Sequence, residues 1–178
     1  QIKNPVHPLI EQGFVNLACA HSVHNFLIVD AAGGGHFKLL PCEIEAAVTG
    51  RTRAIILNSP NNPNGYVYTR GELEQIAQLL EDFDLYCVSD EIYEFLVYEG
   101  AEHISIASIS PQAKERTIVI NGMSKAYRMT GWRIGYLLAP EAVIEQTGKI
   151  AELMHSSVNS LAQYAGVAAP VSYTHLTL

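Results

Sequence analysis

Four short polar segments carry residues whose types and spacing could do chemistry. They read Asn-Asn-Pro-Asn-Gly at 61–65, Ser-Asp-Glu-Ile-Tyr at 89–93, Ser-Lys at 124–125 and Met-Thr-Gly-Trp-Arg-Ile-Gly at 129–135. A lysine amine that is partly desolvated is a nucleophile, and Lys125 lies among glycine, methionine, alanine and tyrosine residues. Arg133, flanked by glycines, suits bidentate capture of a phosphate or carboxylate. Together the segments favour a site that joins an amine, an acid and an anion-binding group.

Each segment alone also has an ordinary structural explanation. Asn61–Gly65 is typical of a turn, and Asp90 could cap a helix after a strand. Lys125 could be a solvated loop charge and Arg133 a surface ion-pair residue. These explanations become improbable together, because all four segments would have to be incidental in one chain.

The elements that must position these segments alternate between strands and helices. Short apolar runs, each rich in Ile, Val or Leu, predict four strands. They are Ala54–Asn58, Leu85–Asp90, Thr117–Asn121 and Ile134–Leu138. The alternation implies a mostly parallel sheet with helices packed on its faces. Ligands bind such sheets at the carboxyl ends of the strands, where the polar segments lie.

Three helices are expected between and after these strands. Thr69–Phe83 has a capping box, since Thr69 precedes Glu72 by three residues, and an apolar stripe. Another helix begins near Pro140 and carries an apolar face, and a weaker helical pattern covers Pro41–Val48. The apolar face of the Pro140 helix comprises Val143, Thr147, Ile150, Ala151 and Met154.

The composition excludes several classes of protein. The 178 residues are 48 % hydrophobic and 16 % charged, which is typical of a globular protein and not of a disordered or fibrous one. The net charge of −7, without a Lys/Arg run, argues against nucleic acid or an anionic membrane as partner. No aliphatic stretch is long enough to span a bilayer, and no signal peptide is visible.

Cysteine and histidine usage favours a cytoplasmic protein without a structural metal. The three cysteines lie far apart and form no CxxC pair, so neither a disulfide framework nor a zinc site is indicated. His21 and His24 have the spacing of a ligand pair, but no HExxH motif accompanies them. We therefore expect no metal and a reducing compartment.

The order and spacing of the motifs resemble those of the fold-type I, pyridoxal-phosphate-dependent aminotransferases. The resemblance rests on Asn62-Pro63-x-Gly65, Asp90-x-x-Tyr93 and the segment from Ser124-Lys125 through Met129-Thr130-Gly131-Trp132-Arg133-x-Gly135. It covers roughly 37–169 and is strongest to the bacterial and archaeal aspartate aminotransferase branch. It implies the large domain of that fold, a three-layer α/β structure whose mostly parallel sheet has helices on both faces.

The resemblance implies a role for each motif residue. Lys125 matches the lysine that forms the internal Schiff base with pyridoxal 5'-phosphate and then moves a proton. Asp90 matches the acid that pairs with the pyridine nitrogen, so that the ring can accept electrons. Tyr93 and Asn62 match groups that hydrogen-bond the phenolic oxygen of the cofactor, and Asn62 also lies near the substrate in the family. Ser124 and Arg133 match phosphate anchors.

Other parts of the chain depart from the family pattern. Residues 1–36 match poorly, the Gly33–Gly35 run is read as a flexible turn, and 170–178 reads as a non-native tail after a domain at 37–169. Gly122 stands where some relatives have a phosphate-binding serine, and no ring-stacking aromatic residue is identified. The chain opens with Gln1 and lacks the family's small domain, so we interpret it as a fragment of a homodimeric parent.

The leading function is transfer of an amino group between an amino acid, with aspartate first, and a 2-oxo acid, with 2-oxoglutarate first. An aromatic or alanine aminotransferase and a carbon–sulfur β-lyase are alternatives on the same scaffold. A cofactor-sensing regulator would need a basic helix-turn-helix module, which this acidic chain lacks. An inactive fragment is the remaining alternative, because truncation could leave the site unassembled.

Overall fold

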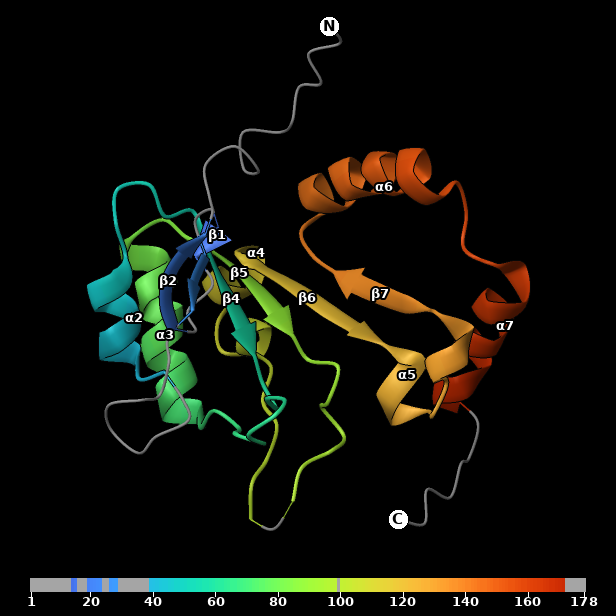
Figure 1. The fold of residues 1–178 in the computed structure, drawn as a ribbon, viewed down its shortest axis with the longest axis horizontal. Helices are drawn as coiled ribbons and strands as arrows, with labels where there is room; N and C mark the ends of the chain where they lie inside the picture. Colours follow the sequence, from blue (N-terminus) through green and yellow to red (C-terminus); the bar gives the residue numbers. More distant parts are fainter. Residues whose placement is uncertain (1–13, 16–18, 24–25, 29–38, 99, 172–178) are drawn as a thin grey trace, which may run out of the picture.

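A five-stranded sheet organises the chain in the computed structural model, which describes residues 14–15, 19–23, 26–28, 39–98 and 100–171 (Figure 1). The strand order is β1-β4-β5-β6-β7. β1 (Phe14–Val15), β4 (Ala54–Asn58), β5 (Tyr86–Asp90) and β6 (Thr117–Gly122) are parallel, whereas β7 (Gly135–Leu138) is antiparallel to β6. β2 (Cys19–Val23) and β3 (Phe26–Ile28) form a separate antiparallel pair.

The four predicted strands are confirmed, with boundaries that differ by at most one residue. The expected α/β class with a mostly parallel sheet is confirmed as well. β7 runs antiparallel to β6, and the segment that joins them, 123–134, contains no helix longer than one turn. Parallel pairs are usually joined by a longer helix that packs on the sheet.

Helices α2 (Pro41–Ala47), α3 (Arg70–Asp82) and α4 (Pro111–Glu115) share one hydrophobic core with β4 and β5. The capping box of α3 is confirmed, since Glu72 donates its backbone N–H to Thr69 Oγ1 and its carboxylate accepts the backbone N–H of Thr69 at 2.9 Å. The core side chains include Ile44, Ile55, Leu57, Leu73, Ile76, Leu80, Leu85, Cys87 and Ile106.

The two faces of the sheet are covered unequally in the described part of the chain. Ile55, Leu57 and Cys87 point into the core beneath the helices. Because side chains alternate along a strand, Val88 points to the other face, where it is half-buried, and Ile120 on that face is 42 % exposed. Helices were expected on both faces of the sheet. In the described part of the chain they cover one face fully and leave the other partly exposed.

Helix α6 (Glu141–His155) follows β7, as predicted, with Pro140 as the residue before its first turn. None of its residues is buried, and Ile150 and Met154 of the predicted apolar face are exposed. Figure 1 shows α6 beyond the β7 edge of the sheet. An amphipathic pattern predicts a helix but does not specify its partner surface. No helix in the described part of the chain is long and apolar enough to cross a membrane.

Several segments and side chains considered in the sequence analysis lie outside the described residues. They are most of the segment 1–36, including Gly33–Gly35, the side chains of Cys19, His21 and His24, and residues 172–178 of the expected tail. Helix α7 (Ser160–Ala168) and η3 (Ala169–Val171) end the described part.

The two cysteines with described side chains should differ sharply in reactivity. Cys42 is exposed, whereas Cys87 is fully buried in β5. Burial, together with the Glu91 carboxylate, raises the pKa of the Cys87 thiol, so that it stays protonated at neutral pH. We expect iodoacetamide to alkylate Cys42 in the native protein and Cys87 only after unfolding, as read by peptide mass mapping. Equal alkylation rates would contradict the burial of Cys87.

Candidate active site

The predicted site segments leave the same edge of the sheet. The register pairs Asn58 with Asp90 and Asp90 with Ile120 across three adjacent parallel strands. The carboxyl ends of β4, β5 and β6 therefore lie side by side (Figure 1). The loops that follow carry Asn62, the Asp90–Tyr93 segment and the Ser124–Lys125 segment.

The loop after β4 is folded around Asn58. Its Oδ1 accepts hydrogen bonds from Asn61 Nδ2 at 2.9 Å and from the backbone N–H of Asn62 at 3.3 Å. Gly65 closes the loop, with its N–H donated to the Asn61 carbonyl and a φ of +71°, a region that favours glycine. The Asn-Pro-x-Gly pattern is thus a turn, and the turn presents the exposed side chain of Asn62.

Tyr93 links the segments after β4, β5 and β6. Asn62 Nδ2 donates a hydrogen bond to Tyr93 Oη at 3.0 Å. Lys125 Nζ lies 5.4 Å from the centroid of the Tyr93 ring, within the range of a cation–π contact. Three predicted site residues that are far apart in the sequence are therefore brought together around one phenol.

Asp90 is half-buried at the end of β5 and on the same face as Asn58. Its Oδ1 accepts the backbone N–H of Ile92 at 3.2 Å, and its carbonyl oxygen accepts Asn58 Nδ2 at 3.3 Å. The local N–H bond holds the orientation of the carboxylate. Asp90 thus supplies an oriented carboxyl group at the strand end, three residues before Tyr93.

Lys125 lies on the one-turn helix α5 (Met123–Ala126), directly after β6. Gly122 allows β6 and β7 to approach, because a Cβ there would lie 3.0 Å from the Ile134 carbonyl oxygen and 3.1 Å from Gly135 Cα. The glycine that departs from the serine of some relatives therefore has a packing reason. Lys125 itself is exposed, in contrast to the partly desolvated setting that the sequence suggests.

Ser124 and Arg133 flank a backbone hydrogen bond, from the Met123 N–H to the Ile134 carbonyl at 3.3 Å. Arg133 has a φ of +51°, and its Nη1 donates to the Thr130 carbonyl at 3.0 Å. The guanidinium is exposed and directed by its own loop. The backbone bond therefore joins the two ends of the segment that carries both predicted anion-binding residues.

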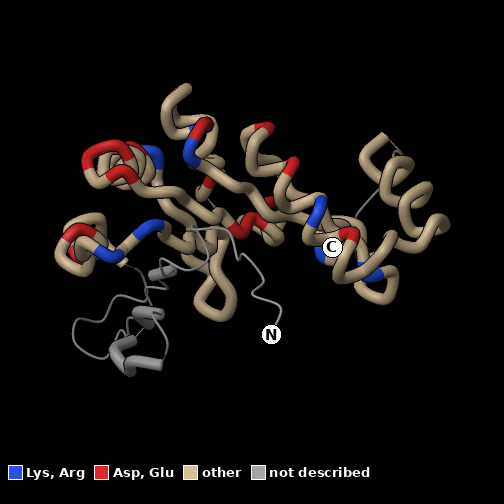
Figure 2. The backbone as a smooth tube through the Cα atoms, turned by 90° about the horizontal axis from the view of Figure 1, so that it is seen from above, with Lys and Arg blue, Asp and Glu red and all other residues tan. Residues whose placement is uncertain are grey.

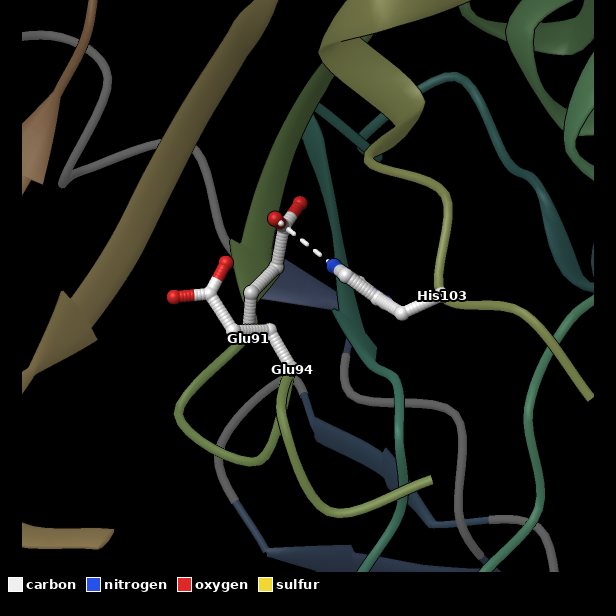
Figure 3. Close-up of side chains that lie close together, drawn as sticks. All are labelled: Glu91, Glu94 and His103. Carbon is white, nitrogen blue, oxygen red and sulfur yellow. Dashed lines mark hydrogen bonds and ion pairs between the residues drawn. The ribbon is translucent and has the colours of Figure 1, made fainter. Parts of the chain in front are cut away.

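A buried polar cluster beneath the site was not predicted from the sequence. Figure 3 shows Glu91 and Glu94 close to His103, and Glu91 also accepts hydrogen bonds from Ser89 and Ser105. The alternation of β5 places Glu91 on the face opposite Asp90, which is the face of the core. That alternation, applied one residue beyond the strand end, could have identified Glu91 as a buried charge.

The chain matches the family model described as "Aminotransferase class I and II" over residues 2–172. It is 45 % identical to an aspartate aminotransferase of Geobacillus stearothermophilus over 141 residues, which is 79 % of this chain and 36 % of that protein. It is 45 % identical to aromatic-amino-acid aminotransferase 2 of Thermococcus litoralis over 133 residues, or 75 % of this chain and 34 % of that protein.

A solved structure, the aromatic aminotransferase from Pyrococcus horikoshii OT3, matches with a TM-score of 0.74 and 42 % identity. The match covers 77 % of this chain and 36 % of that one. The chain therefore spans about a third of the length of the relatives it matches.

Proposed function

Because the chain belongs to the class I and II aminotransferases, we propose that the protein containing it moves an amino group from an amino acid to a 2-oxo acid with pyridoxal phosphate. The observation that carries the proposal is the convergence of Asn62, Tyr93 and Lys125 at the carboxyl edge of the sheet. A nucleophilic amine beside a phenol, near a held carboxylate, is the donor set that this chemistry requires.

The residues at this edge fit each functional group of the cofactor. An aldehyde needs an amine, which Lys125 offers, and a pyridine nitrogen needs an acidic partner, which Asp90 offers. A phenolic oxygen needs donors, and the linked amide and hydroxyl of Asn62 and Tyr93 are donors. For the phosphate, Arg133 offers a planar set of N–H donors and Ser124 a hydroxyl.

When bound, the cofactor supplies an electron sink that stabilises negative charge at the substrate Cα. Lys125 would hold the cofactor through Nζ and, once released, would move a proton at the substrate Cα. The Asp90 carboxylate would keep the ring nitrogen protonated. Asn62 would keep Tyr93 Oη directed through their hydrogen bond, and Arg133 with Ser124 would fix the position of the ring by its phosphate.

Aspartate and 2-oxoglutarate are the proposed substrates. An aspartate aminotransferase is among the relatives, and an aromatic-amino-acid aminotransferase of equal identity makes aromatic substrates the second candidate. The net charge of −7 and the spread of Lys and Arg along the described chain, without one basic stripe, favour small-molecule partners over nucleic acid (Figure 2).

We place the cofactor-binding domain at 37–169, with 1–36 as its N-terminal segment and 170–178 as a non-native tail. The parent protein is proposed to be a cytoplasmic homodimer. The exposed apolar side chains of α6 and α7, such as Leu153, Leu161 and Tyr164, favour further covering by other parts of the assembly.

Cofactor labelling tests this proposal directly. We expect pyridoxal phosphate, followed by borohydride reduction, to label the protein at one peptide, which contains Lys125. The reason is that only an amine beside the phosphate and carboxylate partners is held against the aldehyde. Peptide mass mapping identifies the labelled lysine. Labelling spread over Lys114, Lys149 and other lysines, or none at all, would contradict the assignment of the site.

A further inference from the structure

A buried carboxylate supports the site from the opposite face of the sheet. Glu91 is 3 % exposed and directly follows Asp90. Its Oε1 accepts hydrogen bonds from Ser89 Oγ at 2.9 Å and Ser105 Oγ at 2.7 Å, and its Oε2 lies 3.1 Å from His103 Nε2 (Figure 3). In the tautomer with its proton on Nε2, His103 donates this bond to the carboxylate.

Burying a carboxylate without hydrogen-bond donors costs free energy. When donors satisfy it, the hydrogen-bond network restricts the motion of the groups that it joins. Ser89 anchors it within β5, whereas His103 and Ser105 belong to the segment that leads into η1 (Ile106–Ser108). His103 is itself mostly buried, and its Nδ1 has no hydrogen-bond partner. The three donors therefore tie the end of β5 to the 103–105 segment.

The backbone on both sides of Glu91 carries proposed site residues. The Glu91 N–H donates to the Ile120 carbonyl of β6, and the Glu94 N–H donates to the Glu91 carbonyl, both at 2.9 Å. The turn closed by the second bond contains Tyr93. A shift of the Glu91 backbone would consequently move Asp90 and Tyr93 together.

A second carboxylate extends this support to the lysine segment. Glu94 Oε1 accepts Asn121 Nδ2 at 2.8 Å, and Asn121 Oδ1 accepts the Gly122 N–H at 2.7 Å. Asn121 is buried near the end of β6, four residues before Lys125. The two carboxylates thus connect the segments that carry Asp90, Tyr93 and Lys125.

We propose that Glu91 is a positioning residue, which holds Asp90 and Tyr93 in register with Lys125 through its bonds to Ser89, His103 and Ser105. This inference rests on the proposed function. Glu91, Glu94 and His103 also have ligand atoms within 4.8 Å of one another, as a bound cation would require. Hydrogen-bond donors already occupy both oxygens of Glu91, which favours an anchor over a metal ligand.

Variants of the complete protein, loaded with pyridoxal phosphate, test this role. Glu91→Ala removes all three bonds, Glu91→Gln keeps an oxygen for the two serines, and Glu81→Ala is a control at an exposed glutamate of α3. The readouts are kcat, KM, the dissociation constant of the cofactor, and the pH at which the absorption band of the bound cofactor changes. Thermal unfolding of each apoprotein and metal content by mass spectrometry are measured in parallel.

We expect Glu91→Ala to lower kcat about 100-fold, because a misplacement on the order of 1 Å has an effect of that size, with a smaller change in KM. The pH midpoint of the absorption band should move, and Glu91→Gln should restore most of both properties. Glu81→Ala should match the wild type. A merely structural role would lower the unfolding temperature without moving that midpoint.

Several results would overturn the inference. One is a folded Glu91→Ala variant with wild-type kcat and pH midpoint. If Glu91→Ala does not fold, Ser105→Ala is tested instead, because it removes a single donor to Glu91. An unchanged pH midpoint of the absorption band in that variant would also overturn the inference. Stoichiometric metal whose removal reproduces the Glu91→Ala effects would show a metal site instead. Absence of Lys125 labelling in the wild type would refute the proposed function, whereas labelling with unaffected Glu91 variants would refute only the positioning role.

Discussion

Replacing Lys125 with alanine is expected to abolish transamination by the complete protein, with kcat reduced on the order of 10⁴-fold or more. Proton transfer by a positioned side chain alone contributes up to about that factor, and the covalent role is lost in addition. Lys125 is exposed on α5, so its removal should leave the fold intact. Steady-state kinetics with aspartate and 2-oxoglutarate, and a titration of cofactor binding, measure the two effects separately.

Two comparisons make the lysine prediction specific. Lys125→Arg keeps the positive charge near Tyr93 but replaces the nucleophilic amine by a guanidinium that stays protonated, so it should be as inactive as the alanine variant. Lys114→Ala, at an exposed lysine of α4, should retain wild-type kcat. Substantial turnover by Lys125→Ala would refute the catalytic assignment.

Replacing Asp90 with alanine or asparagine is expected to reduce kcat by about 10²–10³-fold, a typical effect of removing one preorganised electrostatic partner. Asparagine retains an oxygen that can accept the Ile92 N–H, so the local turn should persist while the charge is lost. The cofactor nitrogen would then lose the anion that favours its protonated form. The measurement is kcat for both variants, with the absorption spectrum of the bound cofactor.

Asp82→Asn, at an exposed aspartate near the end of α3, is the matched control and should not change kcat. Asp90→Ala also removes the acceptor for Ile92, so it should unfold at a lower temperature than Asp90→Asn. Near-wild-type activity of Asp90→Asn would show that the carboxylate charge has no electrostatic role in the reaction.

The proposals for Lys125 and Glu91 assign different roles to two residues of the same site. The amine of Lys125 is proposed to react with the cofactor, whereas Glu91 acts by holding Asp90 and Tyr93 in position. We therefore expect Lys125 variants to lose labelling entirely and Glu91 variants to be labelled but slow. This pattern would distinguish the residue that reacts with the cofactor from the residue that positions Asp90 and Tyr93.

Local patterns in the sequence determined the strands, the main helices and the segments of the site. Ala54–Asn58 is a short aliphatic run that forms a strand, and α3 begins after Thr69 because Thr69 and Glu72 cap each other. Such features depend on residues close together in the chain. The motif residues Asn62, Asp90, Tyr93, Ser124, Lys125 and Arg133 could be named for the same reason.

Tertiary structure decided which of these residues meet and what supports them. The Asn62–Tyr93 bond joins residues 31 positions apart, and the Ser105–Glu91 bond joins residues 14 positions apart. Neither pair lies within one helix or strand, so no local pattern in the sequence predicts the contact. The exposure of the apolar face of α6 was likewise not predictable, because periodicity shows that a helix has an apolar face but not which surface packs against it.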